Sequence, residues 1–320
     1  MNNDQFKPAW WLRNAHLQTV WPVFCRRRIS HLQLQRERLE LPDGDFIDLD
    51  WIDRQKEAPL VLILHGLEGS IHSHYAKGML QTIAKNGWRG VFMHFRGCSE
   101  EPNRLPACYH SGKTDDINYV INTLLKREPE TQLGAIGFSL GGNVLLKWLG
   151  ETGKHNPLKA AIAISVPFEL HKTAARIQVG FSKYYQRHLL KCICNRLSKK
   201  FEKMSSPIDR SLLKTIKTMY ELDDKITAPL HGFSGIDEYY QTASSRQYLH
   251  NIQVKTLILH AKDDPLVSEN AIPHANELSH HTKLEVSNAG GHVGFVAGHY
   301  PWRAEYWLEQ RAATFLKEFL

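Results

Sequence analysis

One short segment constrains the fold of this chain more than any other, because it joins a strand, a tight turn and a helix. The apolar run Leu133-Gly134-Ala135-Ile136 predicts a buried strand, and Leu140–Leu149 has a helical pattern. Between them, Gly137-Phe138-Ser139-Leu140-Gly141 fits the pattern G-x-S-x-G. Its two glycines leave room where a Cβ would clash in so tight a turn. The segment therefore predicts an exposed Ser139 hydroxyl above a helix N-terminus, where partial positive charge favours an oxyanion.

A serine nucleophile needs a base, and the base needs an orienting carboxylate. Downstream, the strand-like run Lys255–His260 leads to Asp263-Asp264-Pro265, and a second run, Lys283–Val286, leads to Gly290-Gly291-His292. Both candidates follow a strand, so we expect them at the same carboxyl edge of the sheet as Ser139. The order Ser, Asp, His is the usual chain order in enzymes that carry their nucleophile on this kind of turn. The sequence thus predicts a catalytic triad of Ser139, Asp264 and His292.

Asp264 is preferred to Asp263 as the orienting carboxylate because of its distance in sequence from the end of the strand and because Pro265 follows it. Asp264 stands three residues after Ala261, and Pro265 restricts Asp264 to an extended conformation that aims its carboxylate consistently. Asp263 is expected to meet solvent or the loop backbone. The alternative, in which both carboxylates share the role, stays open.

A second oxyanion donor is predicted upstream of the turn. The apolar run Leu60–Leu64 leads into His65-Gly66-Leu67. The backbone N–H groups of Leu67 and Leu140 are therefore the predicted oxyanion hole. His110 and His260 are weaker candidates for the base, and His260 is expected to pack in the core because it lies within an apolar strand.

The remaining pattern predicts an α/β fold with a mostly parallel central sheet, flanking helices and a helical cap insertion. We interpret residues 1–320 as a single domain, with residues 1–30 irregular and residues 31–52 a hairpin. From residue 59, strands and helices alternate. From about 166 to 250 the segment is basic and helical, in the usual place for a cap over the site; a plain helical excursion is the alternative. The further predicted elements are strands Gly90–Phe95 and Ala160–Ser165 and helices His74–Lys85, Asp115–Lys126 (with Thr114 as N-cap) and Trp302–Leu320.

Composition excludes several other classes of function. The net charge is +7, and most of the Lys and Arg residues are dispersed along the chain. The one dense basic run, Arg26-Arg27-Arg28, is not accompanied by a nucleic-acid-binding motif. A solvated basic face and no nucleic-acid partner are therefore expected. No cofactor and no metal are predicted, because no phosphate loop or ligand spacing occurs and His72 and His74 fit surface or site-lining positions better. Five cysteines and the lack of an apolar stretch of secretory or membrane-spanning length predict a cytoplasmic protein without a transmembrane segment. Oligomeric state stays open.

Several strings spread over nearly the whole chain resemble the YheT-like esterase family of the α/β-hydrolase superfamily, to which the yeast medium-chain fatty-acid ester synthase/esterases also belong. The strings are His16-Leu17-Gln18-Thr19, His65-Gly66-Leu67-Glu68-Gly69-Ser70, Phe95-Arg96-Gly97-Cys98, Tyr109-His110-Ser111-Gly112, the G-x-S-x-G turn, Asp263-Asp264-Pro265 and Gly290-Gly291-His292-Val293-Gly294-Phe295. The resemblance implies an α/β-hydrolase fold and hydrolysis or transfer of short or medium acyl groups without a cofactor.

Together these features predict a serine carboxylesterase that hydrolyses small acyl esters of short or medium chain length through an acyl-enzyme intermediate. The alternative is an acyltransferase that makes esters from an acyl donor and an alcohol with the same residues. A more remote alternative is a non-catalytic protein that uses the pocket to bind lipid.

Overall fold

The computed structural model describes residues 5–26, 32–52 and 57–320, so Arg27 and Arg28 of the basic run lie outside the described residues. Its centre is an eight-stranded sheet in the order β1-β2-β4-β3-β5-β6-β7-β8. Strands β1 and β2 pair antiparallel, as do β2 and β4, and all later pairs are parallel. The strands are β1 (Gln35–Glu40), β2 (Phe46–Ile52), β3 (Leu60–Leu64), β4 (Arg89–Met93), β5 (Leu133–Phe138), β6 (Ala160–Ile164), β7 (Lys255–Ala261) and β8 (Thr282–Ser287). The predicted α/β fold with a mostly parallel sheet is confirmed.

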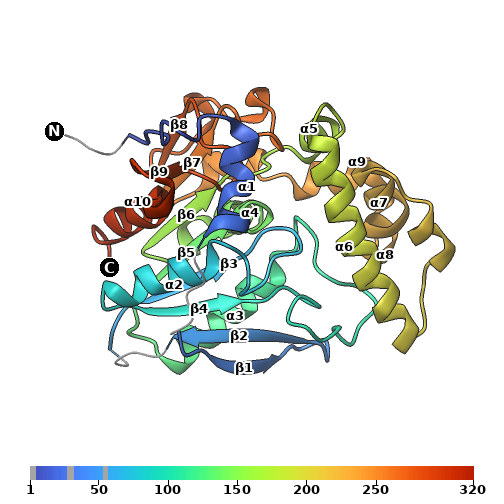
Figure 1. Ribbon diagram of the computed structural model, residues 1–320. Coiled ribbons are helices and arrows are strands. Elements are labelled where there is room, and N and C mark those ends of the chain that lie inside the picture. The colour runs from blue at the N-terminus through green and yellow to red at the C-terminus, as the bar shows by residue number, and fades with distance from the viewer. Residues whose placement is uncertain (1–4, 27–31, 53–56) are drawn as a thin grey trace.

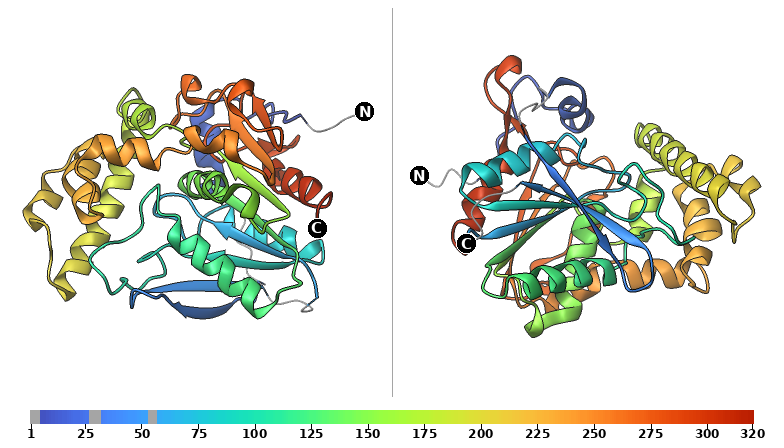
Figure 2. Two further views of the ribbon diagram at one scale, coloured as in Figure 1. Left: turned by 180° about the vertical axis from the view of Figure 1, so that it is seen from behind. Right: turned by 90° about the horizontal axis from the view of Figure 1, so that it is seen from below.

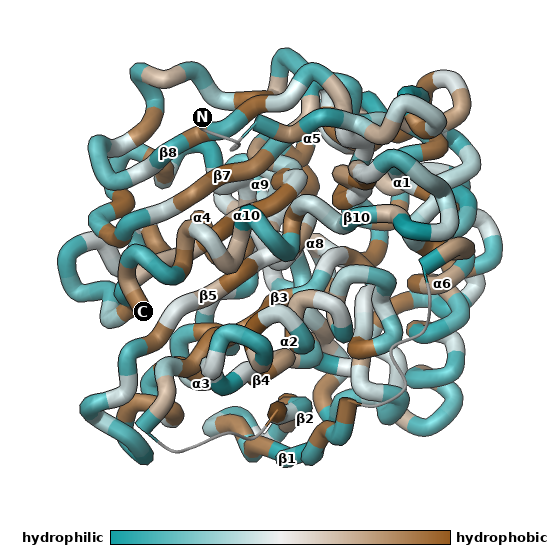
Figure 3. Tube along the Cα trace, turned by 60° about the vertical axis from the view of Figure 1, so that its left-hand side comes forward, coloured by the Kyte–Doolittle hydropathy of each residue, from teal (hydrophilic) through white to brown (hydrophobic). Residues whose placement is uncertain are grey.

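Helices cover both faces of the sheet (Figures 1 and 2). On β3, the even-numbered residues Leu60, Leu62 and Leu64 pack with α3 (Asp115–Arg127) and α4 (Leu140–Thr152). The odd-numbered Val61 and Ile63 pack on the other side with α2 (Ala76–Lys85) and α10 (Trp307–Leu316). Because side chains alternate along a strand, a strand covered on both faces must be apolar throughout. Strand β3 is accordingly hydrophobic along its length, and β5 is fully buried with two glycines among its hydrophobic residues (Figure 3).

Between β6 and β7 the chain is helical, as the sequence predicts. The segment lies together at one side of the molecule (Figure 1) and comprises α5 (Leu170–Arg176), α6 (Ser182–Lys203), α7 (Met219–Leu222), a π-helical turn (Asp223–Thr227), α8 (Ala228–Leu230) and α9 (Ile236–Ala243). Short 3₁₀ turns at Arg210–Lys214 and Arg246–Asn251 complete it. On α6, Leu190, Ile193 and Leu197 join the same buried cluster as the sheet. The helices therefore pack onto the central core.

Three expectations about the termini and caps are wrong. Residues 1–30 are not all irregular, because α1 spans Ala15–Cys25 and the Asn14 side chain accepts hydrogen bonds from the first backbone N–H groups. The last helix is α10 alone, because Pro301–Arg303 form a 3₁₀ turn and Glu305–Tyr306 form strand β10, which pairs with β9 (Val296–Ala297). Thr114 stands at the N-cap of α3, but its hydroxyl donates to Glu151 instead of capping the helix.

Candidate active site

Ser139 occupies the turn between β5 and α4, in a strained backbone conformation with φ 50° and ψ −117°. Its N–H donates to the carbonyl of Ile164 on the neighbouring strand, at 2.8 Å. The flanking glycines are required by close contact: a Cβ on Gly137 would lie 2.5 Å from the carbonyl oxygen of Gly141, and one on Gly141 would lie 2.5 Å from that of His65. A positive φ at a non-glycine residue costs free energy, so the surrounding packing must hold the turn in place.

The structure brings Ser139, His292 and Asp264 together in one chain of hydrogen bonds. His292 Nε2 lies 2.9 Å from Ser139 Oγ, and His292 Nδ1 lies 2.7 Å from Asp264 Oδ2. Asp264 follows β7 and is buried, and its other oxygen accepts the N–H groups of Leu266 and Val267. Burial alone would raise the pKa of Asp264, but the charge of His292 and its hydrogen bond outweigh burial and lower that pKa. The carboxylate is thus held ionised against the imidazole.

Asp263 bonds the backbone of the loop that carries the imidazole. Its Oδ1 accepts the N–H of Gly291 at 2.9 Å, and partial burial raises the pKa of its carboxyl. This geometry agrees with the expectation that Asp263 meets the loop backbone. The hydrogen bond is made to the residue that precedes His292 in the chain.

The loop that carries His292 is tied down along its length. Four of its N–H groups donate to side chains from three parts of the chain: Gly291 to Asp263, Val293 to Ser165, and both His292 and Val296 to helix α1, at Thr19 and Gln18. Gln18 is fully buried and also donates to the carbonyls of Leu12 and Val296. Helix α1 therefore positions the imidazole. Sequence reasoning missed this role, although His16-Leu17-Gln18-Thr19 is among the strings that resemble the esterase family.

The two predicted oxyanion donors lie at the ends of β3 and β5. Leu140 is the first residue of α4, where backbone N–H groups have no partner within the helix. On the other side, the hydroxyls of Tyr75 and Tyr109 accept the N–H groups of Gly66 and Glu68, each at 2.8 Å. The N–H of Leu67 lies between these two anchored neighbours.

Glu68 connects this loop to the helical segment. It has a φ of 53°, and its carboxylate accepts hydrogen bonds from Tyr109 and from Arg196 on α6, at 2.9 Å each. Removing one partner of a largely buried, hydrogen-bonded ion pair destabilises the folded state by about 3–5 kcal/mol, because the other charge stays buried without a partner. Arg196 therefore fastens α6 to the loop that holds Leu67.

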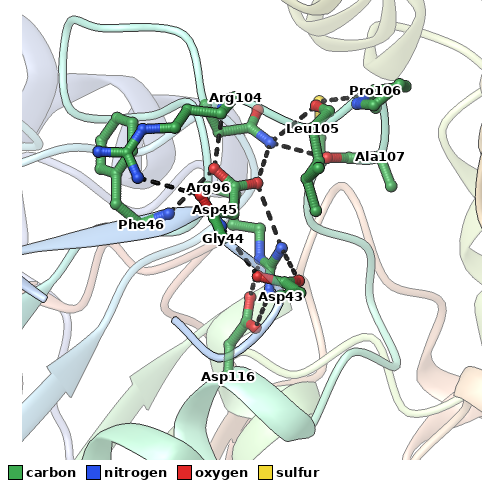
Figure 4. A network of polar contacts seen from close by, with 12 residues as sticks. Asp43, Gly44, Asp45, Phe46, Arg96, Arg104, Leu105, Pro106, Ala107 and Asp116 are labelled. Carbon is green, nitrogen blue, oxygen red and sulfur yellow. Dashed lines mark hydrogen bonds and ion pairs between the residues drawn. The ribbon is translucent and has the colours of Figure 1, made fainter. Parts of the chain in front are cut away.

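A buried polar network fixes the loop that carries Tyr109 (Figure 4). The Arg96 guanidinium donates to Asp116 on α3 and to Asp43 and Asp45 in the turn between β1 and β2. Asn103 donates to Asp45 and to the backbone at residues 105 and 107, and accepts from Lys200 of α6. The loop thus sits between the hairpin and the helical segment.

Several other histidines near the site lie in enclosed surroundings, whereas His72 and His188 line the cavity and are exposed. Burial lowers the pKa of His65 and of His74 to about 3, and that of His260 to about 4, so these side chains are neutral at pH 7. His260 is fully buried, as expected, with Nε2 4.0 Å from Asp264 Oδ2. His110 packs against His231 and accepts the N–H of Gly112. In the described ranges, no group of three or more His, Cys, Asp or Glu side chains is placed to hold a metal ion.

Ser139 and His292 open into a cavity of about 1080 Å³, bounded by α1, by the loop around Leu67 and by α6. A second, smaller cavity of about 80 Å³ lies beneath the helical segment, where Leu67 and Leu140 form part of its wall. Leu67 thus lines both the wide cleft and the narrow pocket, whereas Leu140 lines only the narrow pocket.

Comparison with known proteins identifies the fold family. A family model described as alpha/beta hydrolase fold matches residues 59–298. The chain belongs to the α/β-hydrolase family. It is 39% identical to the Escherichia coli (strain K12) protein named "Putative esterase YheT", over all of this chain and 95% of the relative. It is 32% identical to a monoacylglycerol lipase of Saccharomyces cerevisiae, over 96% of this chain and 68% of that protein.

Solved structures agree on the fold. The Pyrococcus furiosus esterase Pf2001 superposes with a TM-score of 0.58 at 19% identity, over 90% of this chain and 93% of that one. The family resemblance and the enzyme class expected from the sequence, a carboxylic ester hydrolase, agree with these relatives. No helix in the described parts of the chain is long and apolar enough to cross a membrane.

Proposed function

We propose that this α/β hydrolase is a serine carboxylesterase that acts on short- or medium-chain acyl esters. The observation that supports this most directly is the hydrogen-bonded sequence Ser139, His292, Asp264, with separations of 2.9 and 2.7 Å. These distances suit direct proton transfer from the hydroxyl to the imidazole. Ser139 is half-buried but lines the adjoining cavity, which gives an ester carbonyl access to it.

In the proposed mechanism, Ser139 Oγ attacks the ester carbonyl carbon while His292 Nε2 takes its proton. The N–H groups of Leu67 and Leu140 stabilise the tetrahedral oxyanion. His292 then returns the proton to the leaving alcohol oxygen, and the acyl group stays on Ser139. Water attacks next, with His292 as base, and releases the acid. Asp264 holds the imidazole tautomer and stabilises its positive charge throughout.

The helical segment 166–250 is the proposed cap. Its support is the contact of Arg196 with Glu68 and the narrow pocket between α6 and Leu140. We place the acyl chain in that pocket and the alcohol part in the wide cleft. A series of p-nitrophenyl esters of increasing acyl length tests this placement: kcat/KM should fall once the chain outgrows the pocket.

The test of the nucleophile uses a fluorophosphonate probe, which reacts with activated serines. Ser139→Ala should abolish labelling and lower kcat by about 10⁴ or more. The matched control Ser211→Ala changes an exposed hydroxyl that donates to Asp209, and it should behave as the wild type. A Ser139→Ala protein that keeps a tenth of the wild-type turnover would rule out this mechanism.

The rival acyltransferase activity differs only in the second step, where an alcohol replaces water. Ester formation in the presence of ethanol, at the expense of free acid, would favour it. A protein that binds the esters without turning them over and without labelling would instead be a lipid-binding protein.

A further inference from the structure

Large apolar side chains are exposed on two segments that touch each other. Phe24 on α1 is 82% exposed, and Phe181 at the start of α6 is 53% exposed. The segments meet where the His16 ring packs on Phe181, with centroids 4.7 Å apart, and His16 Nδ1 lies 3.2 Å from the Tyr185 hydroxyl. We call the exposed set the apolar rim: Leu17, Val23, Phe24, Val179, Phe181 and Tyr184, each more than half exposed.

The apolar rim stands at the mouth of the catalytic cavity. Val23 and Phe24 line the same cavity as Ser139 and His292, and Leu189 of α6 lines it from the opposite side. Because Phe24 both lines the cavity and is largely exposed, the cavity opens to the outside at the rim. Contiguous exposed apolar surface on a folded protein marks an interaction site. Here Val23 and Phe24 bring that surface to the entrance of the cavity.

The two segments that carry the rim have charged side chains of one sign only. Neither residues 5–26 nor residues 170–201 contain an Asp or a Glu. On α6, Lys183, Arg187 and Lys191 are exposed at intervals of four residues, so they form a basic stripe along the helix beside Tyr184. In Figure 1, α5 and α6 lie to the right of α1, and the contacts of His16 with Phe181 and Tyr185 join the two segments. Exposed aromatic and aliphatic side chains next to Lys and Arg are the pattern of interfacial membrane binding.

We propose that the apolar rim docks this protein onto the surface of an anionic lipid membrane. The aromatic and aliphatic side chains enter the interface, and the basic stripe lies over the acidic headgroups, where each Lys or Arg adds attraction. A lipid ester then passes from the membrane directly into the cavity. The docking itself does not depend on the catalytic residues; only the nature of the cargo, an acyl ester, rests on the proposed function.

The test is co-flotation with vesicles of phosphatidylcholine, with and without added phosphatidylglycerol. The wild type should float with the anionic vesicles and much less with the neutral ones. Phe24→Gln and Phe181→Gln together should weaken partitioning about tenfold or more at any salt concentration. The basic-stripe variant combines Lys183→Gln, Arg187→Gln and Lys191→Gln. At low salt its partitioning should be about as weak as that of the phenylalanine variant, and at high salt it should match the wild type, because salt screens exposed charges.

The matched control is Val286→Gln, which changes an exposed apolar residue on β8 and should leave partitioning unchanged. The basic-stripe variant should keep wild-type turnover of a soluble short ester and lose turnover of a vesicle-borne ester. Ser139→Ala should float like the wild type, so failure of the esterase proposal would not affect this result.

Two results would overturn the docking proposal. One is a wild type that stays with the aqueous phase whatever the vesicle composition. The other is a stable dimer in light scattering that Phe24→Gln converts to a monomer, because a second copy of the chain would then cover the rim.

Discussion

Replacing Asp264 by Asn is the sharpest test of the site, because the hydrogen bonds around this carboxylate determine the orientation of the amide group that replaces it. Oδ1 of Asp264 accepts two backbone N–H groups, those of Leu266 and Val267, while Oδ2 faces His292 Nδ1. An amide nitrogen cannot accept the backbone donors. The carbonyl of the introduced amide must therefore keep them, and its NH₂ group must face the imidazole.

This orientation forces the wrong tautomer. His292 Nδ1 would have to accept a hydrogen bond, so the ring proton would move to Nε2, which faces Ser139 Oγ. A protonated Nε2 cannot take the serine proton. In the serine-protease template the same change lowers kcat by about 10⁴, which corresponds to about 5.4 kcal/mol in the activation free energy. We expect a loss of this size for Asp264→Asn in steady-state hydrolysis of a p-nitrophenyl ester.

Asp263→Asn is the matched control at the adjacent position. Its Oδ1 accepts the N–H of Gly291, and an amide carbonyl can do the same. The loss in kcat should therefore be less than tenfold, or about 1.4 kcal/mol. Reversed losses would identify Asp263 as the orienting carboxylate, and equal large losses would indicate that the two share the role.

Three further changes address the base, the oxyanion loop and a buried acid. His292→Gln should be as damaging to kcat as loss of the nucleophile, whereas His110→Gln, outside the hydrogen-bond chain, should be far milder; near-normal kcat/KM in the first would contradict the assignment. Tyr109→Phe removes the acceptor of the Glu68 N–H and should lower kcat by about 10–100-fold with little change in KM, since one buried donor left unpaired costs about 1–3 kcal/mol. Burial raises the pKa of Asp223 from 3.8 to about 6, so the folded state gains stability from its protonation below pH 4 and loses it as the pH rises through 6. In urea unfolding, the wild type should thus lose on the order of 3 kcal/mol relative to Asp223→Asn between pH 4 and pH 7, and a constant difference would refute this.

The sequence predicts those parts of the fold that short-range patterns encode. It predicts strand β3 at Leu60–Leu64 to the residue, because a run of five apolar residues bounded by Pro59 and by His65-Gly66 is typical of a short buried strand. The turn at Ser139 follows from glycines whose spacing is fixed by close backbone contact. The neighbourhood of Ser139, Asp264 and His292 also follows from strand order, because each stands after a parallel strand.

Contacts between distant segments cannot be predicted in this way. Thr19 accepts the His292 N–H across 273 residues, and Arg196 pairs with Glu68 across 128. Nothing in the local sequence of either partner specifies the other. The predicted C-terminal helix is too long for a similar reason: the apolar pattern continues through residues 302–306, but pairing of Glu305–Tyr306 with Val296–Ala297 takes these residues out of the helix. Tertiary hydrogen bonds there outweigh local helical preference.

Two helices connect the proposed chemistry with the proposed membrane contact. Helix α1 holds the His292 loop through Thr19 and carries Phe24 on its outer side, and α6 holds the Leu67 loop through Arg196 and carries the basic stripe. The inner residues, Thr19 and Arg196, can therefore be changed separately from the outer residues, which are Phe24 and the basic stripe. Variants of the inner residues should alter turnover of every ester, soluble or vesicle-borne, because they disturb the imidazole or the oxyanion loop. Basic-stripe variants should alter only turnover that begins at a lipid surface. If both classes of variant changed soluble and vesicle-borne turnover equally, the helices would serve catalysis alone.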